Sequence, residues 1–138
     1  MADVLVDASA LVAVLDRDDP WHAASVRALA EIRSGLLTVW PAFTEAIHLL
    51  GKFPAAQEAL FEMVEDGPLR IAALDDTDVP RMKALMRKYR DTPMDFADAA
   101  LVRVAERDQL SQILTFDAHF RVYALAKRGR FIVLPGRT

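Results

Sequence analysis

Residues 4–15 of the chain read VLVDASALVAVL. The three apolar residues 4–6 predict a short buried strand, and the apolar run 10–15 predicts a helix. Asp7 stands between them, in an otherwise apolar segment that has no structural need for a charge. The segment therefore predicts a strand that passes into a helix, with an acidic side chain at the point where the strand ends.

The same alternation of strand and helix continues along the chain. Four more strands are predicted, at residues 36–39, 69–74, 112–115 and 131–134. Helices are predicted at residues 21–33, 41–50, 54–64, 79–89, 96–105 and 120–128. This alternation is typical of a parallel sheet with helices on both faces. We expect one domain, residues 1–138, with an α/β fold: a three-layer α/β/α sandwich around a central, mainly parallel sheet of four to five strands.

The composition narrows the class of protein. Hydrophobic residues make up 53% and charged residues 27% of the 138 residues, as in ordinary globular domains. The net charge of -3 argues against a protein that coats nucleic acid by bulk charge, but permits a nuclease with a local basic rim. Without cysteine there are no disulfides, thiolate zinc sites or cysteine nucleophiles. We find no signal peptide and no membrane-spanning run, and expect a cytoplasmic protein that does not bind membranes.

Four acidic residues lie far apart in the sequence but at equivalent places in the predicted fold. Asp7 and Asp117 follow strands, Asp98 opens the most apolar helix, and Glu45 lies one turn into helix 41–50. The carboxyl ends of parallel strands share one sheet edge, where ligands bind. Two like charges ~4 Å apart repel by roughly 4 kcal/mol at an effective dielectric of 20. A divalent cation would relieve that repulsion, and oxygen ligands suit Mg²⁺ or Mn²⁺ and metal-assisted hydrolysis.

Each acid also has a local explanation. Asp7 or Ser9 could cap the first helix, and Asp117 could cap the helix that follows it. Asp95 and Asp98 have the spacing of a capping box. Glu45 could belong to a solvated helix face. Taken singly, capping is the better interpretation of the three aspartates, but the joint placement of the four acids at one edge favours a common site.

Three segments and their order resemble a known family. VDASALVAVL (6–15), PMDFADAALVRVAER (93–107) and ILTFDAHF (113–120), with an acid in the third helix, together resemble the PIN-domain ribonucleases, in particular bacterial toxins of the VapC type. The resemblance covers essentially the whole chain.

The resemblance implies roles for individual residues. It implies the catalytic acids Asp7, Glu45, Asp98 and Asp117, with the metal held by Asp7, Asp98 and Asp117. It also implies Ser9 and Thr115 as supporting hydroxyls. Asp95, three residues before Asp98, either caps its helix or assists the site.

The family also implies an activity and partners. It implies a Mg²⁺-dependent (or Mn²⁺-dependent) endoribonuclease that leaves 5′-phosphate and 3′-hydroxyl ends on its RNA substrate. Such toxins pair with a small antitoxin protein that blocks the site, and they form homodimers. Basic residues at positions 87, 88, 90, 121, 127, 128 and 130 could hold RNA phosphates.

Two other functions are compatible with parts of the pattern. One is a PIN-like module that binds nucleic acid or a partner without catalysis, against which the complete set of four acids argues. The other is a phosphotransfer domain with an aspartate nucleophile. The latter lacks a suitably placed lysine after a late strand and a second aspartate two residues after Asp7.

Overall fold

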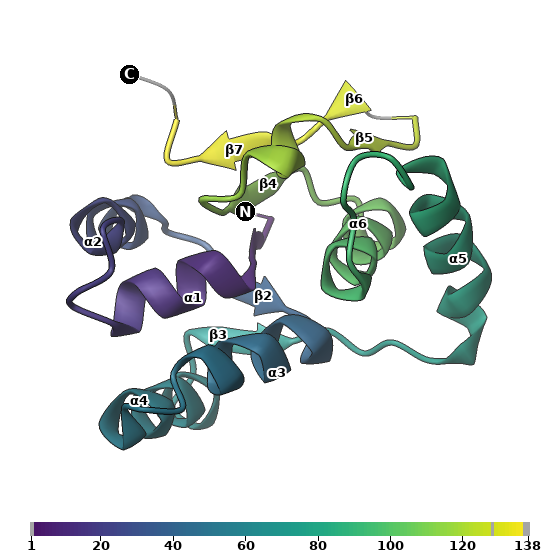
Figure 1. The fold of residues 1–138 in the computed structure, drawn as a ribbon. Coiled ribbons are helices and arrows are strands. Elements are labelled where there is room, and N and C mark those ends of the chain that lie inside the picture. The colour runs from purple at the N-terminus through teal and green to yellow at the C-terminus, as the bar shows by residue number, and fades with distance from the viewer. Residues whose placement is uncertain (1, 128, 137–138) are drawn as a thin grey trace.

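The computed structural model describes residues 2–127 and 129–136, and it places a five-stranded sheet between two groups of helices (Figure 1). The strands are β1 (Val4–Val6), β2 (Leu36–Thr38), β3 (Leu69–Ile71), β4 (Gln112–Leu114) and β7 (Ile132–Leu134). Their order is β3-β2-β1-β4-β7, and every neighbouring pair is parallel. The predicted central parallel sheet is therefore confirmed, with β1 at its centre and β4 beside it.

Alternate side chains of the central strands enter two separate cores. Leu5 and Ile113 belong to one apolar cluster, whereas Val4, Val6 and Leu114 belong to the other. Successive residues of a strand point to opposite faces of the sheet, and apolar residues on both faces are typical of a parallel sheet that is covered on both sides. The continuous apolar runs in the sequence reflect this double burial.

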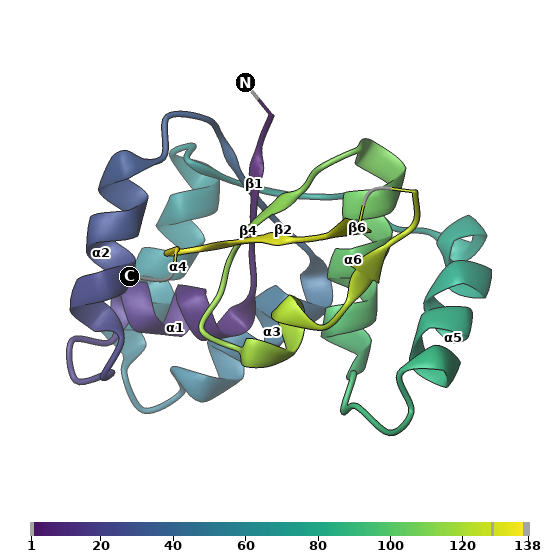
Figure 2. The same cartoon turned by 90° about the horizontal axis from the view of Figure 1, so that it is seen from above.

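In the part of the chain that the structure describes, six α-helices cover the two faces of the sheet. They are α1 (Ala8–Leu15), α2 (His22–Glu31), α3 (Trp40–Leu49), α4 (Pro54–Glu65), α5 (Val79–Lys88) and α6 (Phe96–Asp108). Helices α1, α2 and α4 lie on one side of the strands, and α5 and α6 lie on the other (Figure 2). Helix α3 packs with α1 and also contacts α6. Within the described residues, none of these helices is long and apolar enough to cross a membrane.

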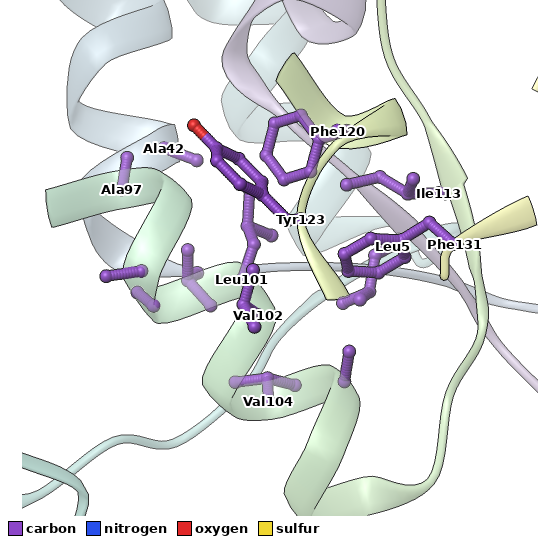
Figure 3. Close-up of a cluster of buried hydrophobic side chains, with 14 of the residues drawn as sticks. Leu5, Ala42, Ala97, Leu101, Val102, Val104, Ile113, Phe120, Tyr123 and Phe131 are labelled. Carbon is purple, nitrogen blue, oxygen red and sulfur yellow. The ribbon is translucent and has the colours of Figure 1, made fainter. Parts of the chain in front are cut away.

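Helix α6 forms the centre of the larger core. Leu101 and Val104 are fully buried and lie with Leu5 and Ile113 of the sheet (Figure 3). The rings of Phe120 and Tyr123 pack over them in a T-shaped pair with centroids 5.2 Å apart. The apolar faces of this helix hold it against the sheet, so its first turn is fixed relative to the ends of the central strands.

The prediction of a helix at residues 120–128 is wrong. The structure has a short 3₁₀ helix, η2 (Ala118–Arg121), and then a two-stranded hairpin formed by β5 (Ala124–Leu125) and β6 (Gly129–Arg130). Lys127 and Gly129 adopt left-handed φ angles of 65° and 77°, which a right-handed helix cannot contain. Residue 128, the predicted end of this helix, lies outside the described residues.

Candidate active site

The two central strands bring distant residues to one edge of the sheet. Asp7 directly follows β1, and the segment 115–117 directly follows β4, the parallel neighbour of β1. The Asp7 N–H donates to the Leu114 carbonyl at 3.4 Å, so the pairing continues to the first acid. In such sheets ligands bind beyond the carboxyl ends of strands where the chain winds in opposite directions. Asp7 and Asp117 lie at that place.

Asp7 is buried and held by three donors. The Thr115 hydroxyl donates to Asp7 Oδ2 at 2.5 Å, and the Ser9 hydroxyl donates to Oδ1 at 2.7 Å. The Ala10 N–H also donates to Oδ1, at 3.0 Å, so Asp7 caps α1 as well. Burial raises the pKa of Asp7 to about 6, against the lowering effect of these hydrogen bonds. The capping interpretation and the site interpretation thus both apply to this residue.

Ser9 and Thr115, predicted as supporting hydroxyls, tie Asp7 to the segment after β4. Ser9 Oγ accepts the Phe116 N–H at 3.0 Å, and Thr115 Oγ1 accepts the Asp117 N–H at 3.0 Å. Each hydroxyl therefore donates to Asp7 and accepts from the loop that carries Asp117. This network fixes the loop and the first acid relative to each other.

Asp98 lies in the first turn of α6 and forms a capping box with Asp95. The Asp98 N–H donates to Asp95 Oδ1 at 2.8 Å, and the Asp95 N–H donates to Asp98 Oδ2 at 3.4 Å. Burial, and after it the charges of Asp95 and Asp117, raise the pKa of Asp98 well above its usual range. Asp95 is thus a helix cap whose negative charge also raises the pKa of Asp98.

Tyr123 is a part of the site that sequence reasoning missed. Its hydroxyl lies 3.0 Å from Asp98 Oδ2 and 2.9 Å from the Pro93 carbonyl oxygen, so one hydrogen is shared between two acceptors. Burial, followed by the charge of Asp98, raises the pKa of Tyr123, so the phenol remains a donor. In the sequence this tyrosine is one apolar residue among others, and nothing local points to Asp98.

The four predicted acids act on one another electrostatically. Partial burial, followed by the charges of Asp95 and Asp117, raises the pKa of Glu45, which is exposed on α3. The charge of Asp117 also acts to raise the pKa of Asp7 and of Asp98. The structure therefore brings Asp7, Glu45, Asp98 and Asp117 into one field of negative charge, to which we refer as the acidic site.

The acidic site opens to solvent through a hollow of about 340 Å³. Its lining residues are Pro93, Met94, Asp95, Asp98, Asp117 and His119. His119 Nδ1 lies 2.9 Å from Asp117 Oδ1, and the His119 N–H donates to the same oxygen at 2.9 Å. Asp117 also caps η2 and is one of the more accessible acids, with 33% of its side chain exposed.

The donor chemistry of the acidic site fits a hard divalent cation. In the part of the chain that the structure describes, no three acidic or histidine side chains form a ready-made ligand set for a metal ion. The available donors, however, are carboxylate oxygens, and two of the acids are buried with raised pKa values. Oxygen donors of this kind suit Mg²⁺ and Mn²⁺. Asp117, with 33% of its side chain exposed, is more accessible to an ion from solvent than the buried Asp7 and Asp98.

A family model described as PIN domain matches residues 4–126. The chain belongs to the PIN-domain family. Ribonuclease VapC26 of Mycobacterium tuberculosis (strain ATCC 25618 / H37Rv) is 28% identical over 135 residues, which span 96% of this chain and 100% of that protein. The predicted membership of the PIN family is therefore confirmed.

Solved structures show the same fold for this PIN domain. The crystal structure of the Mycobacterium tuberculosis toxin VapC20, which cleaves the sarcin-ricin loop, superposes with a TM-score of 0.77 at 17% identity, covering 84% of this chain and 91% of that one. A toxin-antitoxin complex from Klebsiella pneumoniae gives a TM-score of 0.62 at 17% identity, covering 84% of this chain and 88% of that one. The predicted three-layer fold is confirmed.

Proposed function

We propose that this PIN domain is a metal-dependent endoribonuclease and the toxin of a toxin–antitoxin pair. The observation that carries the proposal is the acidic site itself, in which the sheet edge gathers four carboxylates in one field of charge. The similarity to a ribonuclease over 96% of the chain supports RNA as the substrate. A phosphotransfer domain is not supported by any of these similarities.

In this proposal Asp7, Asp98 and Asp117 hold Mg²⁺, for which Mn²⁺ can substitute. When bound, the cation lowers the pKa of a water molecule and neutralises charge on the scissile phosphate. Ser9 and Thr115 keep the Asp7 carboxylate in its orientation through their hydrogen bonds. Attack of water on phosphorus breaks the bond to the 3′-oxygen and leaves a 5′-phosphate and a 3′-hydroxyl.

In this proposal Glu45 moves the proton of that water. It is exposed on α3, while burial and the charges of Asp95 and Asp117 raise its pKa. A carboxylate with a raised pKa is a better general base near neutral pH than an ordinary one. Glu45 therefore accepts the proton, and the other three acids remain ionised around the cation.

We also propose that an antitoxin and a second copy of the chain cover part of the apolar surface. Large apolar side chains on α3, on α4 and between them are about half exposed: Trp40 at 59%, Leu49 at 55%, Phe53 at 45% and Phe61 at 47%. Extended exposed apolar patches mark sites of protein association. A toxin that is held inactive by a small partner in the cytoplasm needs such a surface.

The test is RNA cleavage by the purified chain, free of antitoxin, in Mg²⁺, in Mn²⁺ and in EDTA. We expect cleavage with either metal, none in EDTA, and product ends that carry 5′-phosphate. Asp7→Asn should abolish cleavage while the protein still folds. Asp76→Asn is the matched control, because Asp76 also follows a strand but lies after the edge strand β3 and is exposed.

Two outcomes would overturn the proposal. Cleavage that persists in EDTA or in Asp7→Asn would exclude the metal mechanism. Binding of RNA without cleavage in either metal would instead identify a PIN-like binding module.

A further inference from the structure

A second hollow, which we call the aromatic hollow, lies next to the acidic site. It has a volume of about 550 Å³, and its lining includes Trp21, Thr115, Phe116, Asp117, Arg121 and Pro135. Asp117 lines this hollow as well as the one that opens the acidic site. Both hollows are therefore lined by the same proposed metal ligand, Asp117.

The aromatic hollow contains an unusual pair of rings. Trp21 and Phe116 stack nearly parallel, with centroids 5.2 Å apart and an interplanar angle of 11°. Trp21 nevertheless remains 52% exposed. Phe116 covers one face of the indole, so much of the remaining apolar ring surface faces solvent. An exposed, flat aromatic surface is suited to stacking with another planar group.

The ring pair is fixed relative to the acidic site. The Phe116 N–H donates to Ser9 Oγ at 3.0 Å, and the same hydroxyl donates to Asp7 Oδ1 at 2.7 Å. On the other side, the Trp21 N–H donates to Asp19 Oδ1 at 2.8 Å, which fixes the backbone before α2. A planar group on this pair would therefore keep a constant position relative to Asp7.

We propose that the aromatic hollow binds one unpaired nucleobase of the RNA, next to the phosphate that is cleaved. Trp21 and Phe116 form the stacking platform, and Arg121 binds a neighbouring phosphate. This inference rests on the proposed function and specifies its substrate: RNA that is single-stranded at the cleavage position, because a paired base cannot leave its stack without cost.

The chemistry of the hollow favours a nucleotide over an apolar protein segment. It combines a flat aromatic surface with the cation of Arg121, and it shares Asp117 with the hollow of the acidic site. A stacking platform together with a cation for the backbone is the common arrangement of single-strand RNA sites. A docked protein segment would not need a stacking platform and a cation beside a proposed metal ligand.

Fluorescence gives a direct test of binding. The chain has two tryptophans, so Trp40→Phe leaves Trp21 as the only indole. In an Asp7→Asn background, which prevents cleavage, an unstructured oligoribonucleotide should quench Trp21 emission in a saturable way. The same oligonucleotide with an abasic residue at the position beside the cut should quench it much less. Equal quenching by both oligonucleotides would overturn the proposal.

Kinetics on the otherwise wild-type chain give the second test. Trp21→Ala should raise KM by about 5- to 150-fold, the range expected for one base–aromatic stack, with a smaller change in kcat. Trp21→Phe should restore most of the loss, and Arg121→Gln should raise KM independently. Met86→Ala is the matched control, because Met86 is an exposed large apolar residue on α5 that lines neither hollow.

The outcomes separate this proposal from the proposed function. If the wild-type chain cleaves RNA and Trp21→Ala leaves KM unchanged, the stacking site is wrong and the nuclease stands. If Trp21→Ala changes only the oligomeric state or antitoxin binding, the rings belong to a protein interface, and the proposal is overturned. If the wild-type chain cleaves no RNA, the proposed function fails. The stacking site still stands in that case if an oligoribonucleotide quenches Trp21 emission in a saturable way and a fully abasic oligonucleotide of the same length does not.

Discussion

Tyr123 alters the acidity of Asp98 through a single hydrogen bond. The phenol donates to Asp98 Oδ2 at 3.0 Å, and this bond lowers the pKa of Asp98 against the effect of burial. Tyr123→Phe removes the donor and leaves the ring, so the pKa of Asp98 rises further. We expect the acid limb of the pH–rate profile to move to higher pH by up to about one unit, because a hydrogen bond to a charged group contributes about 1.5 kcal/mol.

Tyr89→Phe is the control for this change. Tyr89 is also a buried tyrosine whose hydroxyl makes a hydrogen bond, but it accepts the Ala124 N–H at 2.8 Å instead of donating to an acid. Tyr89→Phe should lower Tm without moving the pH profile. An unchanged profile in Tyr123→Phe would show that Asp98 is not the group whose ionisation limits the rate.

Thr115 gives a second residue-scale prediction. Its hydroxyl donates to Asp7 and accepts from the Asp117 N–H, so Thr115→Val removes a partner from both acids. We expect a 10- to 100-fold loss of activity, as is typical when an outer-shell partner of a metal ligand is removed. Thr115→Ser keeps the hydroxyl and should retain most of the activity, as measured by initial rates at saturating Mg²⁺. Equal losses in both variants would point to packing instead of the hydroxyl.

At the scale of elements, the first turn of α6 serves two purposes that mutation can separate. Asp95 caps the helix through the Asp98 N–H, and its charge raises the pKa of Asp98 and of Glu45. Asparagine caps as well as aspartate, so Asp95→Asn should leave Tm nearly unchanged and move the acid limb to lower pH. Asp95→Ala should cost about 1 kcal/mol of stability, measured by urea unfolding.

The same pair of variants decides whether Asp95 belongs to the metal site. If Asp95→Asn abolishes cleavage as completely as Asp7→Asn, then Asp95 is a metal ligand and not only a cap.

How well the sequence predicted each element depended on whether its own apolar pattern or its tertiary contacts determine it. Strand β1 and helix α6 are buried on both sides or nearly so, and their apolar runs predicted them well. Residues 120–128 also look helical, but their form depends on tertiary contacts. The Tyr123 hydroxyl donates to Asp98 and to the Pro93 carbonyl, and the Tyr89 hydroxyl accepts the Ala124 N–H. Local sequence cannot show such partners.

The residues of the candidate site also differ in how well the sequence could predict them. Asp7 and Asp117 could be placed at one sheet edge from the sequence because both follow strands of a parallel sheet, whereas the pairing of β1 with β4 is seen only in the structure. The hydrogen bonds of Ser9 and Thr115 agree with the roles that the family resemblance implied. Tyr123 and the Trp21–Phe116 stack could not be predicted, because each joins residues from separate elements through side chains alone.

At the scale of the whole molecule, the sheet concentrates acids at one edge, and this should make stability depend on pH. The pKa of Asp7 is about 6 in the folded chain, against about 3.9 when unfolded. Between these values the folded state binds more protons than the unfolded state, so the free energy of unfolding falls as pH rises. For Asp7 alone the loss is roughly 3 kcal/mol at most, and it is nearly complete by about pH 7. The raised pKa of Asp98 likewise makes the free energy of unfolding fall as pH rises.

We therefore expect the metal-free chain in EDTA to have a lower Tm at pH 8 than at pH 5. Hydrogen bonds and ion pairs lower the pKa of Asp78 and Glu106, so their contributions are lost only at more acidic pH and do not oppose the trend in this window. Saturating Mg²⁺ should raise Tm more at pH 8 than at pH 5, because only the ionised acids bind it and binding stabilises the folded state.

Asp7→Asn isolates the effect of Asp7: its Tm in EDTA should fall less between pH 5 and pH 8. The prediction is contradicted if Tm in EDTA rises between pH 5 and pH 8 in the unmodified chain and rises equally in Asp7→Asn. The ionised, buried carboxylates would then not destabilise the metal-free fold, and a cation would have no such destabilisation to relieve.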